Sequence, residues 1–270
     1  MADFNNAVSG RHPLTARYLA RKVPEITVFF WIVKLLSTAL GESAADYSVI
    51  RINPYLAVGL GGVGLLIALA LQFAVKRYVA WIYWLAVCMV AVFGTMAADA
   101  LHIQLGVPYA VSTIFFAVAL AVTFFIWHRT EKTLSIHTIN SYRRELFYWA
   151  TVMATFALGT AAGDMTAKTL GLGYLTSGIA FAVLFAVPAI AFYLGWLGEV
   201  SAFWFAYVIT RPLGASFADW LGKSRAIGGL GYGDAKVAII LTILIAIFVV
   251  YLTISRVDVK RSIYRNSPRR

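Results

Sequence analysis

The chain has 270 residues, of which 61% are hydrophobic and 13% are charged, and its mean hydropathy is +0.78. A soluble domain carries roughly 25% charged residues, so this composition excludes an ordinary soluble fold and predicts a multi-span membrane protein. The single cysteine, Cys88, excludes a disulfide framework and a thiolate metal site. The segment 1–23 is polar and basic and does not resemble a secretory signal peptide.

Long apolar stretches recur along the chain. A helix needs roughly 20 mostly apolar residues to cross the hydrocarbon core of a bilayer, and these stretches lack the alternation of a membrane β-barrel. We therefore expect an all-α integral membrane fold with eight transmembrane helices. Their expected ranges are 25–48, 54–75, 79–103, 107–127, 145–170, 174–197, 199–221 and 233–254.

The net charge of +11 is explained by where the basic residues fall. With a cytoplasmic N-terminus, Lys and Arg concentrate on the cytoplasmic side, as the positive-inside rule requires, and no nucleic-acid partner is needed. Both termini are then expected in the cytoplasm. The expected segments are an N-terminal tail (1–23), a first four-helix half (24–127), a basic cytoplasmic loop (128–144), a second four-helix half (145–254) and a basic C-terminal tail (255–270).

At four places a tryptophan is followed ten residues later by a glycine and, five residues further on, by an aspartate. The sets are Trp31/Gly41/Asp46, Trp84/Gly94/Asp99, Trp149/Gly159/Asp164 and Trp204/Gly214/Asp219. A match at one fixed spacing indicates a repeat architecture. Each copy continues through a turn rich in Gly or Pro into another apolar stretch. We therefore expect four parallel helix-pair repeats, arranged as two pseudo-equivalent halves.

The spacing also predicts depth. Fifteen helical residues rise about 22 Å, so a tryptophan at the inner interface places its aspartate deep in the outer leaflet. We expect the motif tryptophans, and the tyrosines that end the turns, to anchor the helices at opposite interfaces. The motif glycines begin stretches of small residues, which are typical of tight helix packing in membranes.

Acids inside a membrane are costly, so the motif aspartates are functional candidates. The residues four before them share their helix face: Glu42, Thr95, Thr160 and Ala215. Oxygen-rich clusters with an occasional imidazole suit hard or borderline cations and protons. The candidate ion-binding residues are Glu42, Asp46, Thr95, Asp99, His102, Thr160, Asp164 and Asp219, with Glu42, Asp46 and Asp99 as candidate metal ligands.

The alternative is that these acids are neutralised inside the protein. The candidate charge partners are Lys34, Lys168, Arg211 and Lys223. Lys168 and Lys223 each follow a motif aspartate by four residues, and Arg211 lies one to two turns before Asp219. Lys34 is expected to snorkel or to pair with a motif acid. We therefore expect the acid-rich first half to supply most of an ion site, while the second half is charge-compensated.

The remaining motifs do not indicate an enzyme. The glycine-rich run 228–233 lacks the Gly-Lys-Ser/Thr ending of a phosphate-binding loop. Neither a Ser/His/Asp arrangement nor an HExxH motif is evident in the sequence, so we expect no catalytic residues and no covalent cofactor.

Four segments carry a family resemblance: KVPEITVFFWIVKLLSTALGE, LFYWATVMATFALGTAAGD, LGLGYLTSG and FWFAYVITRPLGASFADWLGK. They resemble a family of uncharacterised bacterial inner-membrane proteins built of Gly-x4-Asp helix-pair repeats. The resemblance runs from Pro24 to Gly222 and implies a multi-pass protein of the bacterial inner membrane, without implying an activity. A looser similarity connects the chain to cation transporters whose paired Glu-x-Gly-Asp helices bind Ca²⁺ or Mn²⁺. The spacing of Glu42 and Asp46 departs from that pattern, so this likeness is an analogy.

These observations favour an inner-membrane transporter of a small inorganic cation, with a divalent metal such as Mn²⁺ as the favoured substrate and protons as candidate counter-ions. Its expected partners are the lipid bilayer and the cation, and assembly with further copies of the chain is left open. The rival hypothesis is a non-transporting membrane sensor or assembly module whose acids are structural ion pairs. The two hypotheses differ in charge balance, since the rival needs a basic partner for every motif acid.

Overall fold

The structure, a computed structural model, describes residues 21–259, except for the side chains of residues 103 and 104. These residues form eight long α-helices and no strand, which confirms the all-α prediction. Most of the two predicted tails lies outside the described residues. The helices are α2 (Val28–Arg51), α3 (Pro54–Ala74), α4 (Ala80–Asp99), α5 (Tyr109–Glu131), α6 (Tyr142–Asp164), α7 (Gly173–Tyr193), α8 (Glu199–Gly222) and α9 (Asp234–Ser255).

Several helix starts follow local sequence signals. The Asn53 side chain accepts a hydrogen bond from the backbone N–H of Tyr55 at 3.0 Å, and Pro54 takes the first position of α3. Proline suits this position because its missing N–H has no helical partner there. Ser141 caps α6 by accepting from the backbone N–H of Arg144. These caps satisfy N–H groups that the first turn of a helix leaves unpaired.

Two helices continue beyond their motif aspartate into a π-helical turn. These turns are η1 (Ala100–Gln104), which follows α4, and η3 (Met165–Thr169), which follows α6. Gly106 and Gly171 then reverse the chain with φ of 63° and 68°, a left-handed conformation that glycine adopts without steric penalty. Since π-turns concentrate at functional sites, both turns draw attention to the end of the bundle that carries the aspartates.

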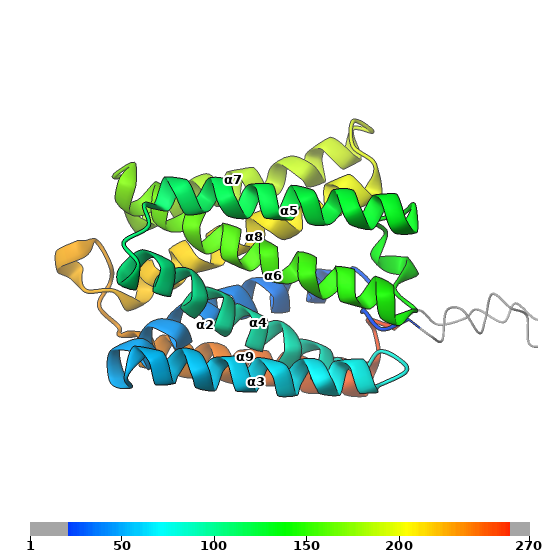
Figure 1. The fold of residues 1–270 in the computed structure, drawn as a ribbon, viewed down its shortest axis with the longest axis horizontal. Coiled ribbons are helices and arrows are strands. Elements are labelled where there is room, and N and C mark those ends of the chain that lie inside the picture. Colours follow the sequence, from blue (N-terminus) through cyan, green and yellow to red (C-terminus); the bar gives the residue numbers. More distant parts are fainter. Residues whose placement is uncertain (1–20, 260–270) are drawn as a thin grey trace, which may run out of the picture.

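The helices divide into an inner and an outer set. The inner helices are α2, α4, α6 and α8, each of which carries one motif. The outer helices are α3, α5, α7 and α9; in Figure 1, α5 and α7 run along one side of the inner helices, and α3 and α9 along the other. The outer helices present large apolar side chains outward, among them Leu60, Ile114, Val183 and Ile240. An apolar surface of this extent is typical of a membrane or protein contact.

Seven of the eight described helices are long and apolar enough to cross a membrane. The exception is α8, which the sequence analysis also assigned as a span. It carries Glu199, Arg211 and Asp219, and the last two of these are buried. Because α8 lies largely inside the bundle, it does not need the continuous apolar surface that the outer helices present.

Each outer helix packs mainly on the inner helix of the next repeat. Thus α3 packs on α4, α5 on α6, α7 on α8, and α9 closes the circle on α2. The inner helices also pack on one another in the cyclic order α2, α4, α6, α8. A helix pair is therefore a unit of sequence but not of packing, and the two predicted halves join in one ring instead of forming separate bundles.

Aromatic side chains form one layer of this ring, near the beginning of the inner helices. The residue before each motif tryptophan contacts the tryptophan of the neighbouring inner helix. The pairs, with their ring-centroid separations, are Phe30–Trp84 (5.7 Å), Tyr83–Trp149 (5.7 Å), Tyr148–Trp204 (6.2 Å) and Phe203–Trp31 (5.7 Å). Because equivalent residues meet all the way around, the inner helices run in the same direction. Trp84, Trp149 and Trp204 are buried, so these tryptophans pack inside the bundle and the expectation of lipid-facing anchors was wrong for them.

The motif glycines form a second layer. Each glycine lies against the residue that precedes the next motif glycine by three positions. The contacts are Gly41 with Ala91, Gly94 with Phe156, Gly159 with Arg211, and Gly214 with Thr38; an added Cβ would approach these residues to 2.5, 3.1, 2.4 and 2.0 Å. Such close approach requires glycine, as the sequence predicted. Because the last contact returns to α2, the ring is closed.

The two ends of the described chain meet at the end of the bundle that carries the aromatic layer. Glu25 N–H donates to the carbonyl of Asp258 at 2.9 Å, and Lys22 N–H donates to the carbonyl of Ile139 at 3.1 Å. The loop predicted over 128–144 is shorter than expected, because α5 extends to Glu131 and α6 begins at Tyr142. Both ends of the described part of the chain and this loop therefore share one face of the protein.

Candidate functional site

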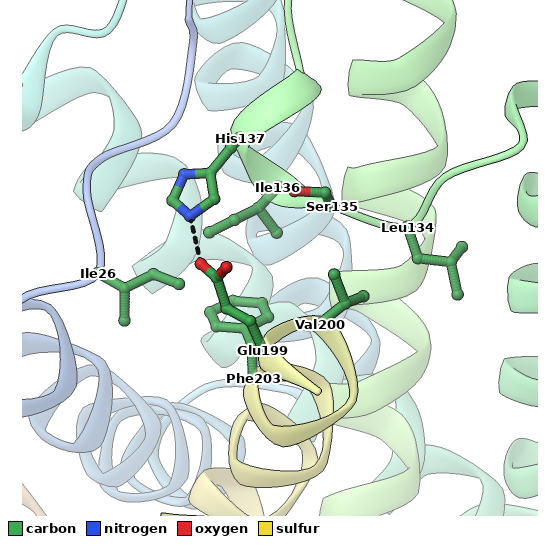
Figure 2. A pocket seen from close by; sticks show the side chains of 8 residues that line it. All are labelled: Ile26, Leu134, Ser135, Ile136, His137, Glu199, Val200 and Phe203. Atoms are coloured by element: carbon green, nitrogen blue, oxygen red, sulfur yellow. Dashed lines mark hydrogen bonds and ion pairs between the residues drawn. The ribbon is translucent and has the colours of Figure 1, made fainter. Parts of the chain in front are cut away.

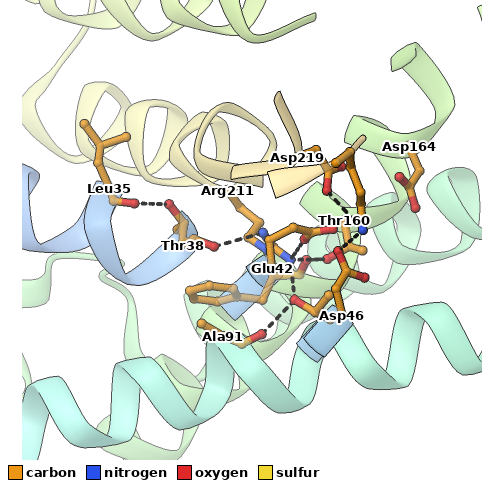
Figure 3. A network of polar contacts seen from close by, with 12 residues as sticks. Leu35, Thr38, Glu42, Asp46, Ala91, Thr160, Asp164, Arg211 and Asp219 are labelled. Carbon is orange, nitrogen blue, oxygen red and sulfur yellow. Dashed lines mark hydrogen bonds and ion pairs between the residues drawn. The ribbon is translucent and has the colours of Figure 1, made fainter. Parts of the chain in front are cut away.

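Arg211 occupies the centre of the ring and is fully buried. Its Nη2 donates to Glu42 Oε2 at 2.7 Å and to Thr160 Oγ1 at 2.8 Å (Figure 3). It also donates to Thr95 Oγ1, while Nη1 donates to the carbonyl of Thr38 at 3.2 Å. One guanidinium thus binds all three of the other inner helices. We call Arg211, Glu42, Thr95 and Thr160 the arginine layer.

The repeat positions explain this convergence. Glu42, Thr95 and Thr160 each follow a motif glycine directly, so the ring brings them to one level. The fourth repeat has the small Ala215 there, and Arg211, one turn earlier on α8, fills the space. The sequence analysis placed Arg211 near Asp219, but the structure pairs it with a residue of the first repeat, 169 positions away.

Lys34 is buried beneath the arginine layer and is not paired with a motif acid. Its Nζ lies 4.0 Å from the ring centroid of Phe156 and 4.3 Å from that of Tyr207. The Nζ has no hydrogen-bond partner among the described residues. Lys34 therefore makes cation–π contacts inside the bundle and neither snorkels nor neutralises an aspartate, which corrects the expectation from the sequence.

The four motif aspartates gather beyond the arginine layer, where they form a carboxylate layer. Asp164 Oδ1 pairs with Lys168 Nζ at 2.8 Å, as the i,i+4 spacing predicted. Lys223 Nζ pairs with Asp46 and lies 3.7 Å from Asp219 Oδ1. Asp99 completes the layer and lies within electrostatic range of Asp46 and Asp164. Figure 3 shows Asp46, Asp164 and Asp219 on the same side of Arg211.

A fifth carboxylate, which the sequence analysis missed, belongs to this layer. Asp234 begins α9, and its Oδ2 lies 3.8 Å from Lys223 Nζ. The sequence does contain a signal for this residue, because Asp234 is an acid at the start of an apolar stretch and directly follows the glycine-rich run 228–233. The layer thus holds Asp46, Asp99, Asp164, Asp219 and Asp234. Two lysines, Lys168 and Lys223, pair with all of these acids except Asp99. Counted as fully ionised, five acids and two lysines leave three negative charges.

Three carboxylates converge closely enough to share a ligand. Glu42, Asp46 and Asp219 each offer an oxygen, and these three oxygens lie within 4.8 Å of one another. Oxygens on opposite sides of Mg²⁺ or Ca²⁺ are separated by about 4–5 Å, since the metal–oxygen distance is about 2.0–2.6 Å. Asp219 is buried, and its Oδ1 accepts no hydrogen bond from the described residues. We call these three acids the carboxylate triad. Glu42 belongs to the arginine layer and to the triad, so it links the two layers.

Lys223 lies just beyond the end of α8, in contact with the triad. Burial by itself disfavours its charged form, but the neighbouring Asp46 and Asp219 outweigh this effect and hold the pKa of Lys223 above the ordinary lysine value. The ammonium is therefore charged at neutral pH. Among the described side chains, Lys223 is the basic residue that pairs with Asp46 and Asp219.

His102, a predicted site residue, lies within electrostatic range of Asp164, but its hydrogen bonds go to other groups. Its Nδ1 hydrogen-bonds the carbonyl of Val107 at 3.0 Å, and its Nε2 lies 3.3 Å from Ser112 Oγ. Its ring packs at a tilt against Tyr109, with a centroid separation of 4.1 Å. The π-turn that follows Asp99 directs the imidazole toward the turn and α5. Both ring nitrogens are occupied, so His102 supports the chain reversal instead of offering a ligand.

The distribution of charge between the halves also differs from the expectation. Basic residues of the fourth repeat pair with acids of the first: Arg211 with Glu42, and Lys223 with Asp46. The first half is therefore not an uncompensated acid cluster. Among the described side chains, Asp99 is the motif acid that forms no ion pair. The sequence suggested charge partners within each half, but Glu42 and Asp46 pair with residues of the fourth repeat.

A small pocket lies at the opposite end of the bundle, beside the aromatic layer. It is formed by Ile26, the segment 134–137 and the start of α8 (Figure 2). His137 Nε2 lies 2.9 Å from Glu199 Oε1, and its Nδ1 lies 3.9 Å from Glu25 Oε2. The two carboxylates approach opposite sides of one imidazole, so they do not converge on a shared ligand position. This contact fastens the N-terminal segment and α8 to the loop.

Fold and site together define an all-helical protein in which a ring of inner helices encloses buried charges. A repeat family described as Repeat of Unknown Function (DUF347) matches the chain at residues 29–78, 82–133, 147–194 and 202–258. These four matches cover most of the chain, which therefore belongs to this repeat family. Each match spans one inner and one outer helix. A search of curated proteins and a search of solved structures found no match.

Proposed function

We propose that the chain is a multi-pass protein of the bacterial inner membrane that transports a small inorganic cation, with a divalent metal such as Mn²⁺ as the favoured substrate. In this proposal the carboxylate layer binds the ion, and protons serve as counter-ions. Carboxylates can replace part of the hydration shell of a cation and so reduce the cost of its entry into a membrane protein.

Membrane insertion is supported by where the apolar residues lie. The outer helices expose large apolar side chains along their length, while the charged residues of the inner helices face the ring. Charges inside a bilayer are tolerated where they face the interior of a bundle and pair with one another. In the proposed arrangement four parallel helix pairs cross the membrane, and α8 crosses it without facing lipid extensively.

The proposed orientation is supported by the distribution of the basic residues. Both ends of the described chain and the loop between α5 and α6 lie at one end of the bundle. Lys and Arg residues described near this end are Arg21, Lys22, Lys76, Arg77, Arg129, Lys132, Arg143, Arg144 and Arg256. Fewer lie near the opposite end, namely Arg51, Lys168, Lys223, Arg225 and Lys236. The positive-inside rule then assigns the chain ends to the cytoplasm and the carboxylate layer to the outer half of the membrane.

The convergence of Glu42, Asp46 and Asp219 within 4.8 Å carries the proposal for a cation. Oxygen donors of this kind suit Mg²⁺, Ca²⁺ and Mn²⁺. The excess of carboxylates over lysines in the layer favours a further positive charge. Asp99, which has no ion-pair partner among the described side chains, lies within electrostatic range of two triad members, Glu42 and Asp46, and would add attraction for a cation.

The test is uptake of Mn²⁺ into proteoliposomes that contain the purified chain, with protein-free liposomes as the control. We expect uptake by the wild-type chain and a strong loss in Asp99→Asn. This substitution removes a charge without leaving a basic partner unpaired, so the variant should melt like the wild type. Uptake that is unchanged in Asp99→Asn would remove this acid from the site. A wild-type chain that takes up none of Mn²⁺, Mg²⁺, Ca²⁺, Co²⁺, Ni²⁺ or Zn²⁺ would contradict transport itself.

The second candidate function is a non-transporting membrane sensor or assembly module. It is favoured by the ion pairs of Glu42, Asp46, Asp164 and Asp219, each of which has a basic residue within 4.0 Å. Under this alternative the acids hold the ring together. All their neutral variants should then lose thermal stability, and no ion flux should be measured in any of them.

A further inference from the structure

The Lys223 ammonium occupies the space that a bound cation would need. Its Nζ contacts Asp46 and lies 3.7 Å from Asp219 Oδ1, and both acids belong to the carboxylate triad. Two positive charges this close repel strongly in a partly buried site. A cation can therefore bind to the triad only if the ammonium leaves it.

Asp234 offers the ammonium a second position. Its Oδ2 lies 3.8 Å from Lys223 Nζ, and it is not a member of the triad. Its Oδ1 accepts no hydrogen bond from the described residues. The carboxylate rests against Gly222, where an added Cβ would lie 2.2 Å from Oδ1. Asp234 is thus an acceptor with unused capacity beside the lysine, and the adjacent glycine leaves room for it.

The main chain at Lys223 is held in place while its side chain retains freedom. Its N–H donates to the carbonyl of Asp219 at 2.8 Å, and its carbonyl accepts from Gly231 N–H at 2.8 Å. The side chain itself is 19% exposed. A lysine has a flexible four-carbon stem, so the ammonium can move between two carboxylates by rotation of the side chain alone.

We propose that Lys223 is a built-in competitor for the cation site: it neutralises Asp46 and Asp219 when the site is empty and moves to Asp234 when a divalent cation binds. This inference rests on the proposed cation transport. Its consequence is that the carboxylates always have a counter-charge, since leaving a buried charge unpaired is costly. The return of the lysine would promote release of the ion.

The test is Mn²⁺ binding to the full chain in detergent, measured from the electron paramagnetic resonance signal of free Mn²⁺. Lys223→Met removes the competing ammonium. Mn²⁺ binding should then tighten by about tenfold, because the triad no longer has to release the ammonium before the ion can bind. Lys223→Gln should behave likewise and guards against a folding defect of one variant. Lys168→Met is the matched control, since it removes the same charge from the Asp164 pair. If Lys223→Met and Lys223→Gln bind like the wild type or more weakly, or if Lys168→Met tightens binding equally, the proposal is overturned.

A double-mutant cycle tests the role of Asp234. Asp234→Asn should weaken Mn²⁺ binding when Lys223 is present and have no effect in the Lys223→Met chain. An equal loss in both backgrounds would make Asp234 a direct ligand and overturn the proposed two-position exchange. If the wild type takes up Mn²⁺ but the Lys223 and Asp234 variants do not change binding as expected, the movement of Lys223 is refuted while the transport proposal stands. Absence of both uptake and binding in every chain would refute both.

Discussion

The arginine layer and the carboxylate layer lie about one helical turn apart on the same four helices, yet they solve the problem of buried charge differently. In the arginine layer one guanidinium meets one carboxylate and two hydroxyl groups, and Arg211 is fully buried. In the carboxylate layer four of the five acids pair with two lysines, and Asp46 and Lys223 each remain 19% exposed. The first layer is closed and nearly charge-balanced, whereas the second is open and acidic.

This difference indicates which repeat positions maintain the ring and which are available to a ligand. A buried charge that loses its only partner is strongly destabilising, so the arginine layer cannot exchange its contacts without a large penalty. The carboxylate layer offers Lys223 three acids, Asp46, Asp219 and Asp234, so this lysine can exchange partners. Glu42 belongs both to the arginine layer and to the carboxylate triad, which would let occupancy of the triad act on the centre of the ring.

The largest effect is expected from breaking the arginine layer. Arg211→Met leaves Glu42 buried without a basic partner, and Glu42→Gln does the same to Arg211. Each substitution should destabilise the protein by about 3–5 kcal/mol, seen as a large drop in melting temperature in detergent. The double variant should lose less than the sum of the two single losses. Strictly additive losses would show that the pair does not couple.

A smaller loss of stability is expected from separating the inner helices. In Gly214→Ala the new Cβ would lie 2.0 Å from Thr38 Oγ1, so α2 and α8 must shift. Overpacking of this kind costs about 1–3 kcal/mol. Gly59→Ala on α3 is the control, because its Cβ would meet nothing within 4 Å and alanine favours helix by up to about 1 kcal/mol. Equal melting temperatures for the two variants would argue against a tightly closed ring.

The smallest effect is expected at the Asp164–Lys168 pair. The Lys168 side chain is 44% exposed, so in Asp164→Asn it can turn to the surroundings instead of being stranded. Asp164 itself is buried, but its replacement leaves no charge stranded. The change in stability should therefore be close to that of a solvent-exposed pair, which contributes about 0–1 kcal/mol, and the melting temperature should change little. A loss as large as that of Arg211→Met would remove the distinction between the layers.

The sequence was sufficient to predict the long helices and the fourfold repeat. Composition and spacing predicted the helices, and the Trp/Gly/Asp motif placed equivalent residues at one level. The cyclic packing was not predictable, because helix periodicity shows which face is apolar but not which helix covers it. The partner of Glu42 was missed for that reason: Arg211 lies three residues before its motif glycine, a position held by Thr38, Ala91 and Phe156 in the other repeats. The available signal was an arginine at a position that faces the ring. Its partner could not be inferred, because the sequence does not show that α8 packs on α2.

The motif tryptophans show the same limit. The rule that places tryptophan at membrane interfaces applies to side chains that face lipid, and the sequence does not reveal that Trp84 and Trp149 face other inner helices. His102 was misplaced because the helical spacing from Asp99 does not hold through the π-turn of residues 100–104. Local pattern therefore located the acidic end of the bundle, while the pairing within it depended on contacts between distant repeats.

The central claim is that a cation binds in the carboxylate layer while the arginine layer stays intact. The most direct measurement is anomalous scattering from crystals of the full chain grown with Mn²⁺. The account predicts an anomalous peak among Glu42, Asp46 and Asp219, with Lys223 turned toward Asp234 and Arg211 still bound to Glu42, Thr95 and Thr160. A protein that holds no Mn²⁺ there, with Lys223 still between Asp46 and Asp219, or a peak elsewhere in the bundle, would contradict it.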